Sequence, residues 1–255
     1  MARLTGANFI SSVDLYKATS SSGSGPQSVG AYAVDGNTGK GFRYVLNGAV
    51  ALVAGNLLQD AVADTQFINM AVGTAGVAGD NSIQVTNGTT TVVPTQYLGG
   101  SIGVYTSGTS LIGEEYTITG VTGTLTTGGA LNVFLDRPLR AAISTSATVN
   151  MKPSPWAGVI QNPATTQTGI PVGVAIYAIP ASTATVFQYG WVQTHGQCNV
   201  LSDGSTFAIG SDLGNLSGTA GAATVYAAGT THVRIGYARQ AAASGKGISV
   251  FLQID

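Results

Sequence analysis

Residues Ile248-Ser249-Val250-Phe251-Leu252-Gln253-Ile254 carry an apolar side chain at every second position. Because successive side chains of a strand point to opposite faces, this period of two predicts a strand with one face on a core. The same alternation recurs at 82–86, 115–119, 131–136 and 232–237. The segment 170–179 is apolar on both faces, which is typical of a central strand covered on both sides. The sequence therefore predicts an all-β fold.

The composition also favours strands over helices. Charged residues make up 8% of the 255 residues, the only glutamates are Glu114 and Glu115, and glycine occurs 36 times. Helix-forming surface residues are therefore scarce, while β-branched residues are plentiful. The turn dipeptides Asn47-Gly48, Asn87-Gly88 and Asp203-Gly204 predict tight hairpins. Many short strands separated by frequent turns indicate a β-sandwich or a β-barrel.

Changes in composition divide the chain into segments. Residues 18–30 are rich in Gly and Ser and predict a flexible linker, so residues 1–40 form an extended N-terminal arm with its linker. Residues 76–154 begin in a glycine-rich stretch and end in a Pro-Ser-Pro sequence. We interpret them as a second β module inserted into a main β domain, which comprises 41–75 and 155–255. A single continuous sandwich is the alternative.

The near absence of charge restricts the partners. A nucleic-acid-binding protein should carry a basic face, but the net charge here is -1, so we expect no nucleic-acid partner. No apolar stretch reaches the length of about 18 residues that a membrane helix needs. Residues 1–5 lack the basic segment and apolar core of a secretory signal, so we expect synthesis and assembly in a cytoplasm. Low charge suits faces that pack against other subunits, although a hydroxyl-rich secreted β protein would share it.

No residue set predicts catalysis. Cys198 and His195 are three residues apart and would point to opposite faces of a strand, and a lone cysteine is usually buried. Glu114 and Glu115 are adjacent, so they cannot flank one glycosidic bond without a bulge. The other carboxylates are scattered, and the glycine-rich stretches lack a phosphate-binding Gly-Lys-Ser or Gly-Lys-Thr. We therefore expect no enzyme, no metal and no cofactor.

Candidate interface residues lie in the arm and in the body. The apolar positions of the arm predict a strand that docks on the body or on a neighbouring subunit, although a frayed terminus is the alternative. In the body, Phe187, Tyr189 and Trp191 share one face of a predicted strand. We favour the core for Phe187, while core and interface are both open for Trp191. The candidates are Phe9, Ile10, Val13, Leu15, Trp156, Tyr189, Trp191 and His195.

Residues 189–196, Tyr-Gly-Trp-Val-Gln-Thr-His-Gly, resemble a segment common in the head decoration (cement) proteins of tailed bacteriophages. In that family a short Val strand and an Asp-Gly turn follow, and residues 198–204 match both. Further segments are similar to the family pattern in the same order, namely 113–118, 135–139, 155–161 and 171–175. The resemblance covers about residues 40–255 and leaves out the arm.

The resemblance implies a structural virion protein on the outer capsid surface, often a homotrimer, that binds the major capsid protein and bridges its subunits. It implies no catalytic residue. The alternative is a phage tail, fibre or host-surface module that binds carbohydrate, in which Trp156 and Trp191 would stack on sugars. A glycosidase is a third hypothesis, and the shortage of carboxylates disfavours it.

Overall fold

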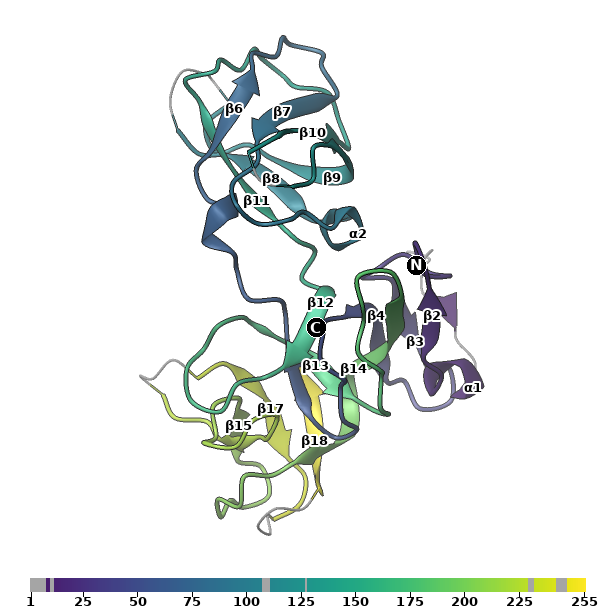
Figure 1. Cartoon of the computed structure of the whole chain (residues 1–255). Coiled ribbons are helices and arrows are strands. Elements are labelled where there is room, and N and C mark those ends of the chain that lie inside the picture. The colour runs from purple at the N-terminus through teal and green to yellow at the C-terminus, as the bar shows by residue number, and fades with distance from the viewer. Residues whose placement is uncertain (1–7, 10–11, 107–110, 127, 229–231, 242–246) are drawn as a thin grey trace, which may run out of the picture. The chain divides into compact units, whose positions relative to one another are not determined.

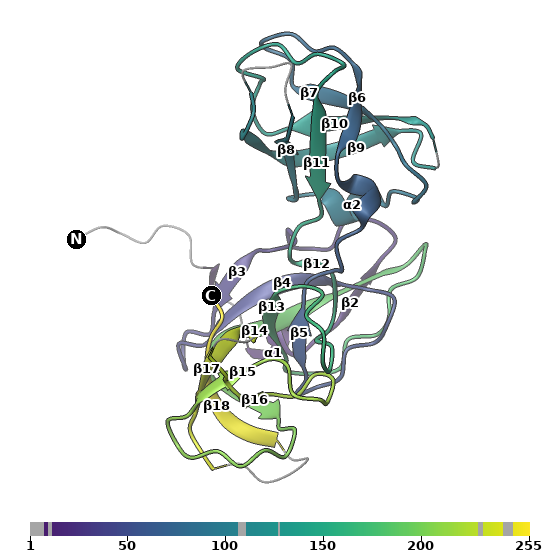
Figure 2. The same ribbon diagram turned by 90° about the vertical axis from the view of Figure 1, so that its left-hand side faces the viewer.

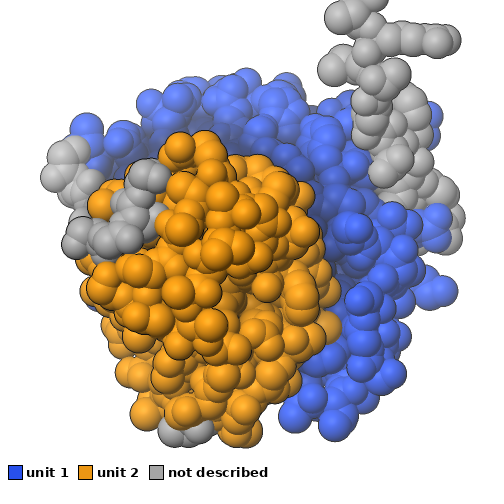
Figure 3. All heavy atoms as spheres, turned by 90° about the horizontal axis from the view of Figure 1, so that it is seen from above, with its two compact units in different colours: residues 1–62, 155–255 blue, residues 63–154 orange. Residues whose placement is uncertain are grey.

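The computed structural model describes residues 8–9, 12–106, 111–126, 128–228, 232–241 and 247–255. Among the described residues, strands make up 43% and helices 4%, so the predicted all-β fold is confirmed. The chain forms two compact units. The first comprises residues 1–62 and 155–255, and the second residues 63–154, coloured blue and orange in Figure 3.

The first unit is built on one large sheet (Figure 1, Figure 2). Its strands are β1 (Asn8–Phe9), β2 (Thr19–Ser21), β3 (Tyr32–Val34), β4 (Gly41–Asn47), β5 (Leu57–Gln59), β12 (Ala157–Gln161), β13 (Pro171–Ala175), β14 (Phe187–Leu201), β15 (Asp212–Gly214), β16 (Thr224–Val225), β17 (Arg234–Ala238) and β18 (Gly247–Gln253). Their order is β1-β3-β4-β12-β5-β13-β14-β18-β17-β15-β16, and β2 pairs with β14. A short helix, α1 (Ser12–Leu15), follows β1.

Strand β14 organises this sheet. Its 15 residues pair antiparallel with β4 from Tyr189 to His195 and with β18 from His195 to Leu201. β13 and β2 pair with its first half as well. Gly190 is required in this strand, because a Cβ there would lie 2.2 Å from the hydroxyl oxygen of Tyr177. β14 thus links β4, which pairs with its first half, to β18, which pairs with its second half.

Apolar clusters cover both faces of the sheet. Phe42 and Tyr44 of β4 belong to one cluster, whereas Val45 of the same strand belongs to another cluster together with Leu52. All five residues of β13 are buried, as the two-sided apolar pattern of 170–179 predicts. Around β18, a third cluster holds Leu57, Val174, Cys198, Val200, Phe207, Leu213, Ile235, Ile248, Val250 and Leu252.

The second unit is a closed barrel. Its strands are β6 (Met70–Thr74), β7 (Ser82–Thr86), β8 (Ser101–Val104), β9 (Glu115–Gly123), β10 (Ala130–Leu135) and β11 (Thr148–Lys152), closed in the order β10-β7-β6-β11-β8-β9. The short helices η1 (Thr65–Phe67) and α2 (Pro94–Tyr97) accompany them. Alternate side chains point inward, for example Ile83 and Val85 in β7. Closure pairs every barrel strand on both sides and leaves no open edge.

The units divide the chain differently from the sequence-based boundary at residue 76. The second unit begins at Ala63, and 63–75 belong to it rather than to the main domain. The reason is β6, which pairs with β7 and β11 and so completes the barrel. The other boundary falls between Ser154 and Pro155.

The structure differs from the predicted arm with a flexible linker, because two segments of 1–40 are strands of the sheet. β2 lies within the Gly/Ser-rich segment and pairs with β14, and β3 pairs with β4. The small residues there allow close packing: a Cβ on Gly25 would lie 3.0 Å from the Tyr189 ring and 3.1 Å from the Tyr44 ring. Small size, rather than flexibility, is what this glycine contributes.

Two predicted hairpin dipeptides have a different role. Asn47 and Asn87 are both buried. The side-chain amide of Asn47 donates to the carbonyl oxygens of Val50 (3.0 Å) and Pro180 (2.6 Å). That of Asn87 donates to the carbonyl oxygens of Thr90, Leu125 and Thr126, at 3.2, 3.2 and 2.9 Å. Each asparagine therefore joins loops that are distant in sequence.

Replacing Asn87 with alanine should destabilise the barrel. The carbonyl groups of Leu125 and Thr126 would lose their donor in a partly buried place, which costs about 2 kcal/mol. Native-state hydrogen exchange of the amides in 63–154 measures this loss. Asn81→Ala removes an exposed asparagine and should change stability by less than about 0.5 kcal/mol. Equal losses in the two variants would contradict the cross-linking role.

Candidate functional site

Tyr189 and Trp191 lie in the core of the first unit, with exposed fractions of 1% and 5%. The ring of Tyr44 stacks on Tyr189 with centroids 5.8 Å apart and lies 5.1 Å from the centroid of Trp191. The Tyr189 hydroxyl donates to the carbonyl oxygen of Gly23 (2.7 Å). The prediction of an interface is therefore wrong for Tyr189, and of the two alternatives open for Trp191 the structure supports the core, because the N-terminal segment of the same chain covers this face.

The arm residues take different positions. Leu15 is 1% exposed and belongs to the cluster around Phe42 and Tyr44, so it is a core residue and not an interface residue. Phe9 lies in β1, which pairs parallel with β3, and Val13 lies in α1. Ile10 lies outside the described residues. A contact of the outer arm with a neighbouring subunit stays a prediction.

Trp156 forms one wall of an arginine site. The guanidinium carbon of Arg43 lies 4.8 Å from the ring centroid of Tyr32 and 5.2 Å from that of Trp156. Arg43 donates from Nε and Nη2 to both carboxylate oxygens of Asp255, at 2.6 and 3.0 Å, and from Nη1 to the carbonyl oxygen of Gly30. Bidentate pairing and ring contacts of this kind require arginine rather than lysine. This site occupies one face of the half-buried Trp156 ring within its own unit, so at most the other face could stack on a sugar.

His195 and Cys198 do not form a catalytic pair in this geometry. The His195 ring meets the Phe251 ring edge-on, with centroids 5.4 Å apart. Cys198 is 6% exposed, and its thiol donates to the carbonyl oxygen of Asn199 (3.6 Å). Burial raises the pKa of the Cys198 thiol to about 12, so the thiol stays protonated at neutral pH.

Glu114 is a structural carboxylate of the barrel unit. It accepts hydrogen bonds from the Tyr116 hydroxyl (2.6 Å) and from Nε of Arg140 (2.6 Å), and Arg137 lies 3.9 Å away. The hydrogen bond from Tyr116, followed by that from Arg140, lowers the pKa of the Glu114 carboxyl. Its neighbour Glu115 is exposed at the start of β9.

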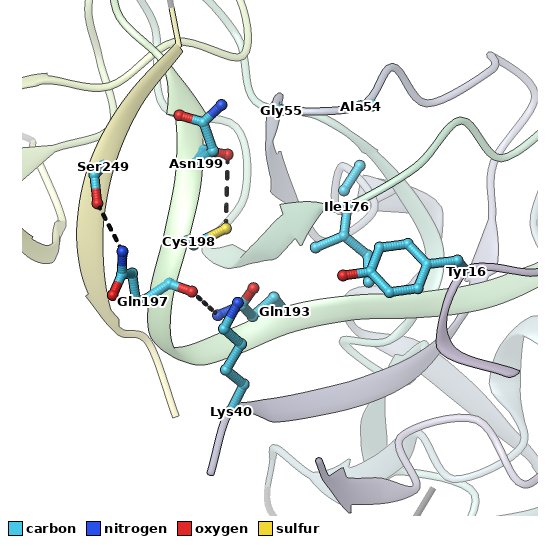
Figure 4. Close-up of a pocket in the computed structure, with 11 residues that line it drawn as sticks. Tyr16, Lys40, Ala54, Gly55, Ile176, Gln193, Gln197, Cys198, Asn199 and Ser249 are labelled. Atoms are coloured by element: carbon cyan, nitrogen blue, oxygen red, sulfur yellow. Dashed lines mark hydrogen bonds between the residues drawn. The ribbon is translucent and has the colours of Figure 1, made fainter. Parts of the chain in front are cut away.

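A pocket of about 510 Å³ opens on the first unit beside β14 (Figure 4). Its lining comes from segments distant in sequence: Tyr16, Lys40, Ala54, Gly55, Ala175, Ile176, Gln193, Gln197, Cys198, Asn199 and Ser249. Gln193 and Gln197 stand on β14, and Ser249 on the neighbouring β18. Figure 4 shows Tyr16 across the pocket from Gln197 and Ser249. The pocket therefore has a polar wall and an aromatic wall.

An uncharged surface of the first unit adjoins the pocket, because Ala54 and Gly55 of its first loop also line the pocket. The loops 48–55 and 180–186 are joined by a hydrogen bond from the Ser182 amide to the Gly48 carbonyl (2.8 Å) and by pairing of Leu52 with Ile179. Val50 and Val53 are exposed by 64% and 55%, and Val186 by 39%. We call 48–55 and 180–186 the neutral loop pair.

Sequence reasoning missed both of these features. The neutral loop pair has a visible signal, because no Asp, Glu, Lys or Arg occurs in 44–59 or in 153–202. The pocket has none, because Tyr16, Lys40 and Ser249 meet β14 only through the fold. Its residue types are common in any polar strand or loop.

Comparison of the chain with protein-family models, curated proteins and solved structures finds no match. In the described part of the chain, no helix is long and apolar enough to cross a membrane. Within the same residues, no three His, Cys, Asp or Glu side chains gather in a way that could hold a metal ion. The function is therefore inferred from the geometry of the chain itself.

Stability of the barrel unit should depend on pH through Glu114. Because the folded-state pKa is lowered, the stabilisation is present above the ordinary glutamate pKa of about 4.3 and is lost as the pH falls through the folded-state value. Glu114→Gln should therefore lower the melting temperature at pH 7 and converge with the native protein in acid. Calorimetry at a series of pH values measures this. Glu115→Gln is the control and should have no effect, while a pH-independent loss in Glu114→Gln would contradict the ionised role.

Proposed function

We propose that this protein decorates the outer surface of a phage head. In this role it binds the major capsid protein as a homo-oligomer, a trimer in the family that it resembles, and stabilises the shell by bridging capsid subunits. It assembles from the host cytoplasm and catalyses no reaction. The observation that supports this function most is the neutral loop pair of the first unit.

The neutral loop pair has the composition of a protein-binding surface. The cores of protein interfaces are poor in charge, because an unpaired charge loses its hydration when it is buried. Val50 and Val53 project from this surface with more than half of each side chain exposed to water. Covering such side chains lowers the free energy of a complex through the hydrophobic effect.

The loop pair is also held in place before any partner binds. Asn47 donates to the carbonyl oxygens of Val50 and Pro180, one in each loop. The Ser182 hydroxyl donates to the carbonyl oxygen of Asn47 (2.7 Å), and its backbone amide bonds to Gly48. A surface ordered in advance loses less conformational entropy on binding, which favours tight attachment.

The sequence resemblance supports the all-β fold that this function requires. It does not identify the surface that contacts the capsid. Its most specific segment, 189–196, contains Tyr189 and Trp191, which are buried. The contact with capsid subunits must therefore use other residues, and the neutral loop pair is the surface that we assign to it. A stable protein interface buries about 1,600 Å², so neighbouring surface would contribute as well.

The double variant Val50→Lys/Val53→Lys tests this function on undecorated phage heads. Two lysines would have to be buried without partners, so occupancy should fall at least about tenfold, which corresponds to about 1.4 kcal/mol. Co-sedimentation measures occupancy, and heat-induced genome release measures stabilisation of the head. Val77→Lys is the matched control, because Val77 is 63% exposed in the second unit.

Binding of the native protein with loss in the double variant alone would support the proposal. Equal occupancy of the double variant and the control would remove the neutral loop pair from the contact. Failure of the native protein to bind heads, together with binding to tails or to host cells, would favour the host-surface alternative.

A further inference from the structure

The pocket beside β14 is a built polar site, and it shares only Ala54 and Gly55 with the neutral loop pair. We propose that it binds an acidic sugar, that is, a pyranose bearing a carboxylate within an oligosaccharide or polysaccharide. Its volume of about 510 Å³ lies in the usual range of ligand sites, about 300 to 1,000 Å³. The inference is argued from the pocket residues and does not use the capsid contact as a premise.

Gln193 is the fixed polar group of the pocket. It is 2% exposed, and its Nε2 donates to the carbonyl oxygens of His195 (3.0 Å) and Gln197 (2.9 Å). These two bonds set the orientation of the amide and leave Oε1 without a hydrogen-bond partner among the described residues. A carbonyl oxygen held this way in a buried side chain is an acceptor for a ligand hydroxyl.

The polar wall continues from Gln193 to the rim. Nε2 of Gln197 donates to Oγ of Ser249 (3.3 Å), so these side chains hold each other beside the pocket (Figure 4). Asn199 adds an exposed amide on the same strand. Amide and hydroxyl groups along one wall can both donate and accept, which matches the hydroxyl groups around the edge of a sugar ring.

The opposite wall is aromatic and apolar. Tyr16 is 57% exposed and faces the pocket, and Ile176 and Ala54 lie near it. A tyrosine ring combines a large apolar face with low conformational entropy, so it can cover the C–H face of a pyranose. An aromatic face opposite a row of amide and hydroxyl groups is the arrangement that suits a sugar ring.

The charge of the pocket selects an acidic sugar. Of the lining residues, only Lys40 is charged. Among the described residues, no carboxylate lies within ion-pair distance of its ammonium group, although Asp35 is near enough for Lys40 to contribute to the lowered pKa of that carboxyl. A ligand carboxylate beside Lys40 would form a charge-assisted hydrogen bond, which is about twice as strong as a neutral one.

Calorimetric titration of the full-length protein with galacturonate and glucuronate trisaccharides tests the proposal. At least one of them should bind, and its methyl ester should bind about tenfold more weakly, since the ester lacks the charge that Lys40 recognises. Lys40→Gln should abolish the difference between acid and ester, and Tyr16→Ala should weaken both. The matched controls in the second unit are Lys152→Gln and Tyr105→Ala, because Tyr105 is 56% exposed.

Several outcomes would overturn the proposal. These are no binding of either acid at millimolar concentration, equal affinity for acid and ester, or equal effects of pocket and control variants. Tighter binding of an acidic peptide such as Gly-Glu-Gly would assign the pocket to a peptide instead. Because the titration contains no capsids, its failure would leave head decoration untouched, and failure of head decoration would leave this result untouched.

Discussion

The first unit depends on β14, a strand of 15 residues that hydrogen-bonds with β4, β13, β18 and β2. The strand carries Tyr189 in one apolar cluster, Val192 in a second and Val200 in a third. It also supplies Gln193, Gln197 and Asn199 to the pocket. The packing of the core and the lining of the pocket therefore depend on the same strand register, because a shift by one residue would exchange the two faces of the strand.

In this protein, buried amide side chains join segments that are distant in sequence, a role that ion pairs have in more highly charged proteins. Asn47 and Asn87 each join distant loops, and Asn162 and Asn215 bond to each other across 53 residues of sequence. An amide both donates and accepts without the desolvation cost of a buried charge. The low charge is thus reflected inside the protein, where amides replace ion pairs. It is also reflected at the surface, in the role that we propose for the neutral loop pair.

The sequence predicts those parts of the fold that depend on local pattern. Alternation at 82–86 and 131–136 matches β7 and β10, because one face of each meets a core. The pattern could not show that β6 closes a barrel, or that a Gly/Ser-rich segment contains β2, because both depend on distant pairing partners. For Tyr189 and Trp191, a period of two identifies a shared face but not what covers it. The pocket was beyond prediction, since its residues come together only through the fold.

Cryo-electron microscopy of phage particles purified from cells that produce this chain tests most directly the proposal that the protein coats the head. The expected result is density for the two β units at equivalent positions on the outer capsid surface, with the neutral loop pair (48–55 and 180–186) against the major capsid protein. Density confined to the tail or its fibres, or a chain absent from the particle, would contradict the proposed function.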